Sequence, residues 1–222
     1  MIRLAHFSDV HLTSPKLGWR VRDLFGKRGT GWVNVRLMGR AHRFRYANEV
    51  VAAMLGDFRT RGYDQLVFSG DATTMAFDSE MTESARRLGV WDQSLPPAIC
   101  VPGNHDLYTF GATRRRTFEF AFSAWQQGER ADDAHTYPFA RKVGHVWLIA
   151  LNSSKPNVLP WDATGRVGRP DDYTPSAGTN TGIVGPPCVG RNATLTRWPI
   201  RSASRSHSST LVIIVTPSSS VT

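Results

Sequence analysis

Three short apolar runs in this chain of 222 residues each end in a cluster of polar side chains. The runs lie near residues 2–8, 65–69 and 98–101, and the clusters that follow are Asp9-Val10-His11, Gly70-Asp71 and Gly103-Asn104-His105-Asp106. Parallel strands deliver the residues after their carboxyl ends to one edge of a sheet. The pattern therefore predicts an α/β fold in which the three clusters form a single site.

Helices are expected between the three runs. Apolar residues recur at spacings of three and four over residues 41–61, and a glycine follows as a stop signal. Similar signals predict helices over residues 79–88 and 113–127, the second with Phe118, Phe122 and Trp125 on one face. Strands are expected over residues 136–143 and 146–152, as the start of a second sheet. Residues 12–40 show no clear period, and we expect them to form an inserted loop or a small cap.

The chain has a net charge of +9, and most of the excess lies in one segment. Between Lys16 and Tyr46 there are nine basic residues and one acid, Asp23, interspersed with apolar and aromatic residues. Such a segment can attract an anionic substrate or rest on an anionic membrane surface. Confinement of the excess to one segment argues against a nucleic-acid-binding protein as the leading interpretation. A solvated connection with a few aromatic anchors explains the same composition equally well.

Composition indicates one main globular domain, because 41% of the residues are hydrophobic. Cys100 and Cys188 lie far apart in the chain, and we expect both to be reduced thiols. The N-terminus leads directly into strand-like sequence, and no apolar run approaches the length of a membrane span. A soluble cytoplasmic protein is therefore expected, and its oligomeric state is not indicated.

The character of the sequence changes at about residue 170. From Asp171 to Thr222, 26 of 52 residues are Ser, Thr, Pro or Gly, which sets this stretch apart from the domain before it. Within it, residues 210–216 alone resemble a strand. We therefore expect a domain over residues 1–169, with a basic insert at about 12–40, and an atypical tail over residues 170–222.

The residue types in the three clusters suit a pair of metal ions. Asp9 and His11, two positions apart on an extended segment, place a carboxylate and an imidazole on the same side, where both can bind one divalent ion. Asp71 has two carboxylate oxygens and can bridge to a second ion, to which Asn104 can offer its amide oxygen. Two metals about 3.5 to 4 Å apart would clamp the attacking and leaving oxygens of a phosphate ester.

His105 is not needed as a metal ligand and can act as a general acid that protonates the leaving oxygen. Asp106, next to it, would orient its ring. Each residue also has an ordinary explanation in turn chemistry, since Gly-Asp and Gly-Asn are common turn dipeptides. Three such clusters after three successive strands are harder to obtain from turn preference alone. The joint pattern therefore favours a phosphoesterase site.

These clusters resemble the first three signature blocks of the calcineurin-like metallophosphoesterases, over about residues 1–169. The resemblance implies an αββα sandwich of two facing sheets flanked by helices, which would be incomplete at its C-terminal side. It also implies two divalent ions (Mn, Fe or Zn), with Asp9, His11, Asp71 and Asn104 as ligands, and a phosphate-ester substrate. His105 and Asp106 would assist the leaving group. Two further runs, residues 7–12 and 148–153, are similar to the cyclic-nucleotide phosphodiesterase-like branch.

The sequence departs from the family after the third block. The family supplies a further histidine and then a Gly-His-x-His block, and neither is present; His135, His145 and His207 do not match them. We hypothesise that the residues after about 169 are read in a shifted frame, which the coding DNA would test. Three functional classes stay open: an active phosphoesterase, a truncated non-catalytic family member, and a module that binds anionic membrane or nucleic acid.

Overall fold

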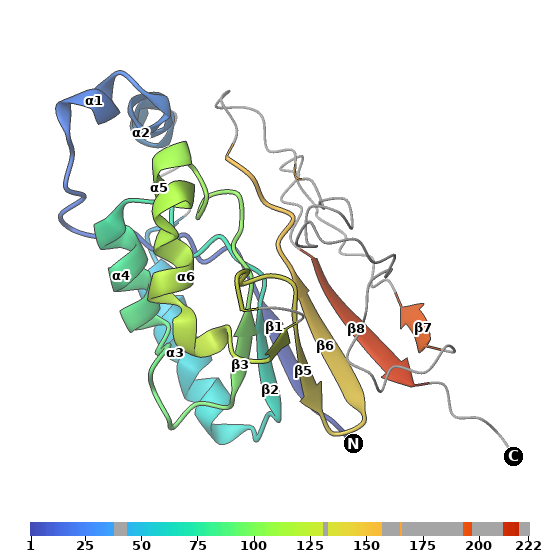
Figure 1. Ribbon diagram of the computed structural model, residues 1–222. Helices are drawn as coiled ribbons and strands as arrows, with labels where there is room; N and C mark the ends of the chain where they lie inside the picture. The colour runs from blue at the N-terminus through green and yellow to red at the C-terminus, as the bar shows by residue number, and fades with distance from the viewer. Residues whose placement is uncertain (38–43, 131–132, 157–164, 166–192, 197–210, 218–222) are drawn as a thin grey trace, which may run out of the picture.

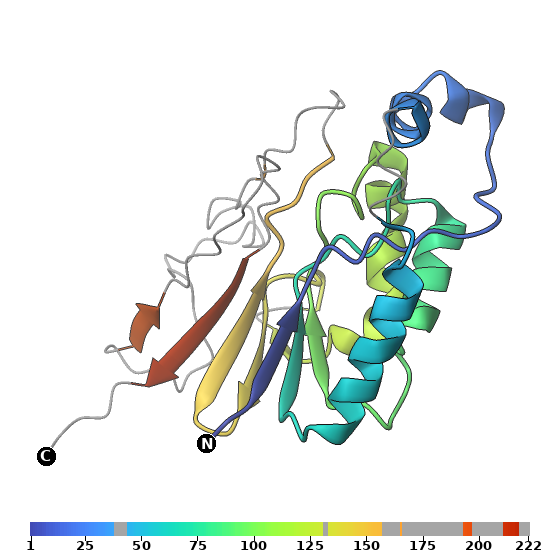
Figure 2. The same cartoon turned by 180° about the vertical axis from the view of Figure 1, so that it is seen from behind.

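Two sheets lie face to face, and helices cover the outer face of the first (Figures 1 and 2). The computed structural model describes residues 1–37, 44–130, 133–156, 165, 193–196 and 211–217. The first sheet is parallel, in the order β1-β2-β3, and consists of β1 (Leu4–Phe7), β2 (Gln65–Phe68) and β3 (Ala98–Cys100). The second is antiparallel, in the order β4-β5-β6-β8-β7, and consists of β4 (Glu129–Arg130), β5 (Phe139–Val143), β6 (Val146–Leu151), β7 (Ala193–Thr196) and β8 (Leu211–Pro217).

The helices that cover the parallel sheet are α3 (Ala47–Thr60), α4 (Asp78–Arg87), α5 (Phe110–Arg115), α6 (Thr117–Ala121) and the 3₁₀ helix η2 (Ser123–Trp125). Two more helices, α1 (Val21–Leu24) and α2 (Lys27–Leu37), lie together at the end of the molecule toward which the parallel strands point (Figures 1 and 2). The site clusters also follow the carboxyl ends of these strands.

Side chains of the parallel sheet alternate between two cores, as the pleat requires. Ala5 and Phe7 of β1 and Phe68 of β2 pack with the helices in the larger core. Val67 of β2 and Ile99 of β3 point the other way and pack against side chains of the second sheet, which are Phe139, Leu148 and Ala150. Both faces of β2 are thus buried, which explains why it reads as a continuous apolar run.

The expected strands are confirmed, and two expected helices need correction. The helix expected over residues 41–61 is present as α3, but it begins only at Ala47. The single helix predicted over residues 113–127 is broken into α5, α6 and η2, because Arg116 adopts a left-handed conformation with φ of 54°. Phe118, Phe122 and Trp125 still share the core, as predicted. The segment 12–40, expected to form an inserted loop or a small cap, contains the helices α1 and α2 although its sequence shows no clear period.

Tertiary contacts rather than periodicity hold α2 in place. Arg28 is buried, and its guanidinium donates hydrogen bonds to the carbonyls of Met75 and Ala76 and to the Asp23 carboxylate. Gly31 lies against Tyr108, so close that a Cβ at this position would come within 2.5 Å of the Tyr108 hydroxyl. Arg28 is therefore a structural residue, which its place in a basic segment did not indicate.

The strand expected over residues 210–216 is confirmed as β8, which pairs with β6 along five residues. Among the described residues, no helix covers the far side of the second sheet, where the resemblance implied an outer helical layer. Most of the predicted tail, with Cys188, lies outside the described residues. Cys100 is buried with a free thiol, as expected. The boundary between domain and tail at about residue 170 stays a prediction.

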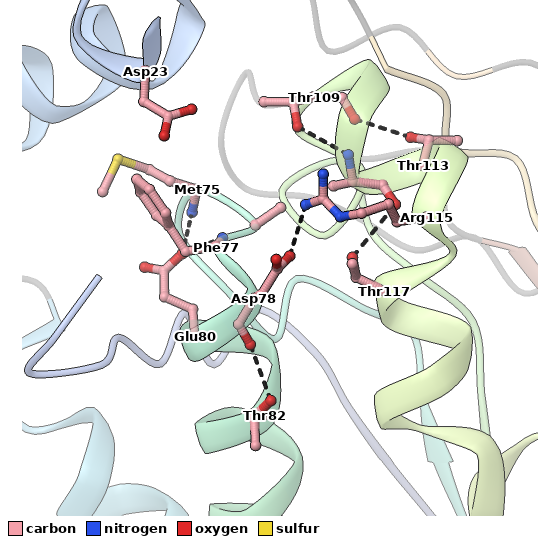
Figure 3. A network of polar contacts seen from close by, with 12 residues as sticks. Asp23, Met75, Phe77, Asp78, Glu80, Thr82, Thr109, Thr113, Arg115 and Thr117 are labelled. Atoms are coloured by element: carbon pink, nitrogen blue, oxygen red, sulfur yellow. Dashed lines mark hydrogen bonds and ion pairs between the residues drawn. The ribbon is translucent and has the colours of Figure 1, made fainter. Parts of the chain in front are cut away.

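Glu80 organises the loop before α4, and Figure 3 shows its surroundings. Its side chain is fully buried and accepts hydrogen bonds from the backbone N–H groups of Met75, at 3.0 Å, and Phe77, at 3.1 Å. Nearby, Arg115 of α5 donates to Asp78 at the start of α4, at 2.8 Å, in an exposed ion pair between the two helices. This loop lies beneath the α1–α2 insert and beside the predicted site.

Burial raises the pKa of Glu80 above its ordinary value, and a pH dependence of stability follows. The folded protein then holds the Glu80 proton to a higher pH than the unfolded chain does, so the free energy of unfolding falls as pH rises between the two pKa values. Urea denaturation at a series of pH values should show a shallower fall for Glu80→Gln. Glu83 should affect stability with the opposite sign, because Arg86 and Arg87 lower its pKa to about 2. Glu83→Gln should remove a stability gain seen on raising pH from about 2 to about 4.5.

Candidate metal centre

The loop after β1 runs alongside the loop after β2, so the backbone pairing of the sheet continues into the predicted site. Asp9 N–H donates to the carbonyl of Gly70 at 3.0 Å, and His11 N–H donates to the carbonyl of Asp71 at 3.0 Å. Asp9, His11 and Asp71 all have positive φ angles, of 58°, 43° and 57°. Positive φ is uncommon outside glycine, and such strained residues concentrate at functional sites.

The loops after β2 and β3 touch backbone to backbone. Gly70 has φ of +94°, and a Cβ there would lie 2.1 Å from the backbone nitrogen of Gly103. A Cβ on Gly103 would in turn lie 2.1 Å from Asp71 Oδ1. Both glycines are needed for this close approach, which brings the third cluster against Asp71. His105 N–H donates to Asp71 Oδ1 at 2.9 Å and locks the two loops together.

Asp9, His11 and Asp71 form a compact group of ligand atoms. One oxygen or nitrogen from each lies within 4.8 Å of the others, and His11 Nε2 is 3.9 Å from Asp9 Oδ1. An ion about 2.1 Å from each ligand atom holds those atoms about 3 to 4 Å apart, so the donor set fits a divalent cation. Asp71 is buried, whereas Asp9 is largely exposed, which leaves one side open to solvent.

The second ring nitrogen of His11 is held in the way expected of a metal ligand. Nδ1 lies 3.2 Å from the carbonyl oxygen of Thr73, and because a carbonyl can only accept a hydrogen bond, Nδ1 carries the proton. Nε2 is then unprotonated, and its lone pair is available to a metal ion. Burial and the nearby His105 lower the pKa of His11, which keeps the imidazole neutral. A neutral imidazole is the form that binds metal.

His105 lies beside this group but is not oriented as the sequence predicted. Its ring meets the His11 ring edge-on at a centroid distance of 4.8 Å and stacks on Tyr108 at 5.7 Å. His105 Nδ1 lies 2.8 Å from the carbonyl oxygen of Thr74, so Thr74 and not Asp106 orients the ring. A backbone carbonyl supplies this role, which explains why no side-chain pattern revealed it.

Asp106 instead fixes the backbone of the site loops. Its fully buried carboxylate accepts hydrogen bonds from Gly103 N–H, Thr73 N–H and Thr73 Oγ1, at 3.0, 3.0 and 3.2 Å. Burial and the nearby Asp71 raise the pKa of Asp106 to about 7. The adjacent Asn104 lies half-buried in the same turn, between Gly103 and His105. Thr73, Thr74 and Tyr108 are site residues that sequence reasoning missed, since none lies in a recognisable motif.

Comparison with known proteins agrees with this geometry. A sequence profile of the calcineurin-like phosphoesterases matches residues 2–176, which is well over half of the chain. The chain belongs to the calcineurin-like phosphoesterase family. A search of curated proteins gave no match. The match is to the family as a whole, so the cyclic-nucleotide phosphodiesterase-like branch stays a prediction.

The family match covers all three clusters and supports a metal-dependent phosphoesterase that acts on phosphate esters. It ends six residues beyond the composition change near residue 170. The mixed fold with its parallel sheet agrees with the α/β fold that the resemblance implied. None of the described helices is long and apolar enough to cross a membrane.

The histidines outside the three clusters lie in different places. His145 is in the turn between β5 and β6, at the end of β6 opposite to Ser154, whose hydroxyl donates to the Pro102 carbonyl beside the site loops. His135 lies in the loop before β5, and His207 is outside the described residues. Within the described part of the chain, Asp9, His11 and Asp71 are the one group of three or more His, Cys, Asp or Glu side chains spaced to hold a metal.

Proposed function

We propose that this calcineurin-like phosphoesterase hydrolyses phosphodiesters or phosphomonoesters at a two-metal site. The observation that carries the proposal is the grouping of Asp9, His11 and Asp71 within 4.8 Å, with the His105 ring against that of His11. Metal ligands and a candidate proton donor thus come from three loops that hydrogen bonds join directly.

Each side chain has a task in this proposal. Asp9, His11 and Asp71 would hold one divalent ion, and Asp71 with Asn104 would hold a second. Ions in these positions supply positive charge that stabilises the charge developing on a phosphate ester during hydrolysis. Two carboxylates and a neutral imidazole suit manganese, iron or zinc.

His105, with both ring nitrogens protonated, would pass the Nε2 proton to the leaving oxygen and keep the Nδ1 proton. The Thr74 carbonyl at 2.8 Å fixes the proton on Nδ1 and turns Nε2 away from the protein backbone. Stacking on Tyr108 limits rotation of the ring. A positioned imidazole contributes about 10² to 10⁴ in rate as a general acid. Asp106 supports this group indirectly, through the loop that carries Gly103 and His105.

The proposal is tested by hydrolysis of bis(p-nitrophenyl) phosphate with added Mn²⁺. The full chain should release p-nitrophenol in a Mn²⁺-dependent manner, and His105→Ala should lower kcat by about 10²-fold or more, since it removes the general acid. His145→Ala, in the turn between β5 and β6, is the matched control and should leave the rate unchanged.

Equal rates for the wild-type protein and His105→Ala would remove the assignment of His105. Complete absence of Mn²⁺-dependent turnover in the wild-type protein, with metal binding intact, would instead favour the second candidate function, a metal-binding family member without catalysis. The absence from the sequence of the family's later histidine blocks favours this alternative. Cytoplasmic location remains a prediction, as do the number and identity of the ions.

A further inference from the structure

The α1–α2 insert exposes large apolar side chains to solvent. Val21, Leu24 and Phe25 are 76%, 59% and 89% exposed, and their spacing of three and four places them on one side of α1 and its C-cap, Phe25. Trp32 and Val33 of α2 are 40% and 45% exposed. We call the face formed by Val21, Leu24 and Phe25 the apolar tip. Exposed groups of large apolar side chains often mark a surface that binds a partner or a membrane.

The insert is anchored to the domain on its other side. Trp19 packs edge-on against Phe77 at a centroid distance of 5.0 Å, and the Arg28 guanidinium lies 4.0 Å above the same ring. The Tyr108 hydroxyl donates to the carbonyl of Lys27 at 3.3 Å. These contacts use other side chains than those of the apolar tip. The contacts thus fix the insert to the domain and leave the apolar tip exposed to solvent.

Charge in the insert is almost entirely positive once its internal ion pair is taken out. Asp23 is the one acid between residues 16 and 46, and Arg28 binds it at 3.1 Å. The other eight basic residues of the segment have no acid among them in the sequence. Arg20, directly before α1, and Lys16, four residues earlier, are exposed. An apolar tip preceded by exposed cations complements a surface with anionic groups above an apolar layer.

We propose that the apolar tip and the exposed Lys16 and Arg20 that precede it dock this protein on an anionic lipid bilayer. Val21, Leu24 and Phe25 enter the boundary between headgroups and acyl chains, and the basic side chains contact the headgroups. Nucleic acid is disfavoured, because a phosphate backbone offers no apolar layer for three exposed aliphatic and aromatic side chains. A second copy of the chain is disfavoured, because it would bring two strongly basic segments together.

Docking in this way orients the candidate metal centre. The insert and the loops after β1, β2 and β3 occupy the same end of the molecule (Figure 1). Tyr108 links the two directly, since it bonds to Lys27 of the insert and stacks on His105. A bilayer contacted by the apolar tip would thus lie at the end of the domain that carries the site. The proposal does not depend on catalysis, and its test measures no turnover.

Co-sedimentation with lipid vesicles tests the proposal. The full chain should bind vesicles of phosphatidylcholine mixed with phosphatidylglycerol, and bind those of phosphatidylcholine alone at least about tenfold more weakly. Leu24→Ser with Phe25→Ser should weaken binding to the mixed vesicles at least about tenfold, because two anchors are lost. Lys16→Gln with Arg20→Gln should weaken it by a similar factor and reduce its salt sensitivity.

Phe120→Ser is the matched control, because Phe120 is 83% exposed on α6, away from the insert. It should leave vesicle binding unchanged, and circular dichroism should show that all variants melt like the wild-type protein. Arg28 is not a suitable target, since its loss would disrupt the insert itself. The proposal is overturned if Leu24→Ser with Phe25→Ser binds mixed vesicles like the wild-type protein. It is also overturned if double-stranded DNA binds in place of vesicles, or if the variant changes only self-association measured by sedimentation velocity.

Discussion

Replacing both Asp9 and Asp71 with asparagine is expected to weaken Mn²⁺ binding by at least about 100-fold, since changes even to groups that support metal ligands cost about 10- to 100-fold. The two substitutions remove both charged ligands of the three-residue group and leave His11. Asparagine is chosen because it tolerates positive φ well, and both positions have φ near 57°. Alanine at these positions would add backbone strain and confuse the result.

Isothermal titration calorimetry with Mn²⁺ measures this loss directly, without any substrate. Asp78→Asn is the matched control: Asp78 is an exposed aspartate at the start of α4 whose partner is Arg115. It should bind Mn²⁺ like the wild-type protein. Unchanged affinity in the double variant would show that the group formed by Asp9, His11 and Asp71 is not the metal site.

The double variant should also differ from the wild-type protein in how Mn²⁺ changes its melting temperature. Excess Mn²⁺ stabilises a protein that binds it only when folded, by about 2.7 kcal/mol at a concentration 100 times Kd. The wild-type protein should therefore melt several degrees higher with Mn²⁺, and the double variant should not. Without metal, the double variant should be at least as stable as the wild-type protein, because two nearby negative charges are removed.

Asp106→Ala is expected to lower the free energy of unfolding by about 2 kcal/mol or more, because each buried group left without a partner costs about 1 to 3 kcal/mol. The fully buried carboxylate accepts hydrogen bonds from Gly103 N–H, Thr73 N–H and Thr73 Oγ1. Alanine leaves the two N–H donors unsatisfied, whereas Thr73 Oγ1 can still donate to the His105 carbonyl at 3.2 Å. These donors belong to the loops after β2 and β3. The loss should therefore also loosen the loop that positions His105.

Urea denaturation measures the effect, and two variants calibrate it. Asp106→Asn keeps one accepting oxygen and should fall between alanine and the wild-type protein. Asp78→Ala removes an exposed carboxylate and should change the unfolding free energy by less than about 1 kcal/mol. If Asp106→Ala were as stable as the wild-type protein, the three hydrogen bonds would not be what holds the site loops together.

The sequence was sufficient to predict the parallel strands and to place the three polar clusters at their carboxyl ends. Apolar runs such as the one ending at Phe68 specify buried strands locally, and sheet geometry then brings Asp9, His11 and Asp71 to one edge. The glycines of the second and third clusters belong to the same pattern, since only Gly70 and Gly103 allow the close loop contact. These features depend on short stretches of chain, so a pattern of residues encodes them.

The arrangement of partners around the clusters depended on the folded structure. The Thr74 carbonyl, and not Asp106, orients His105. Arg28 of the insert is buried, whereas Lys16 and Arg20 of the same basic segment are exposed. The break at Arg116 likewise has no signal in the apolar spacing. Each of these involves backbone groups or contacts between segments distant in the chain. Side-chain patterns carry no direct record of such contacts, because backbone carbonyls and N–H groups are the same at nearly every residue.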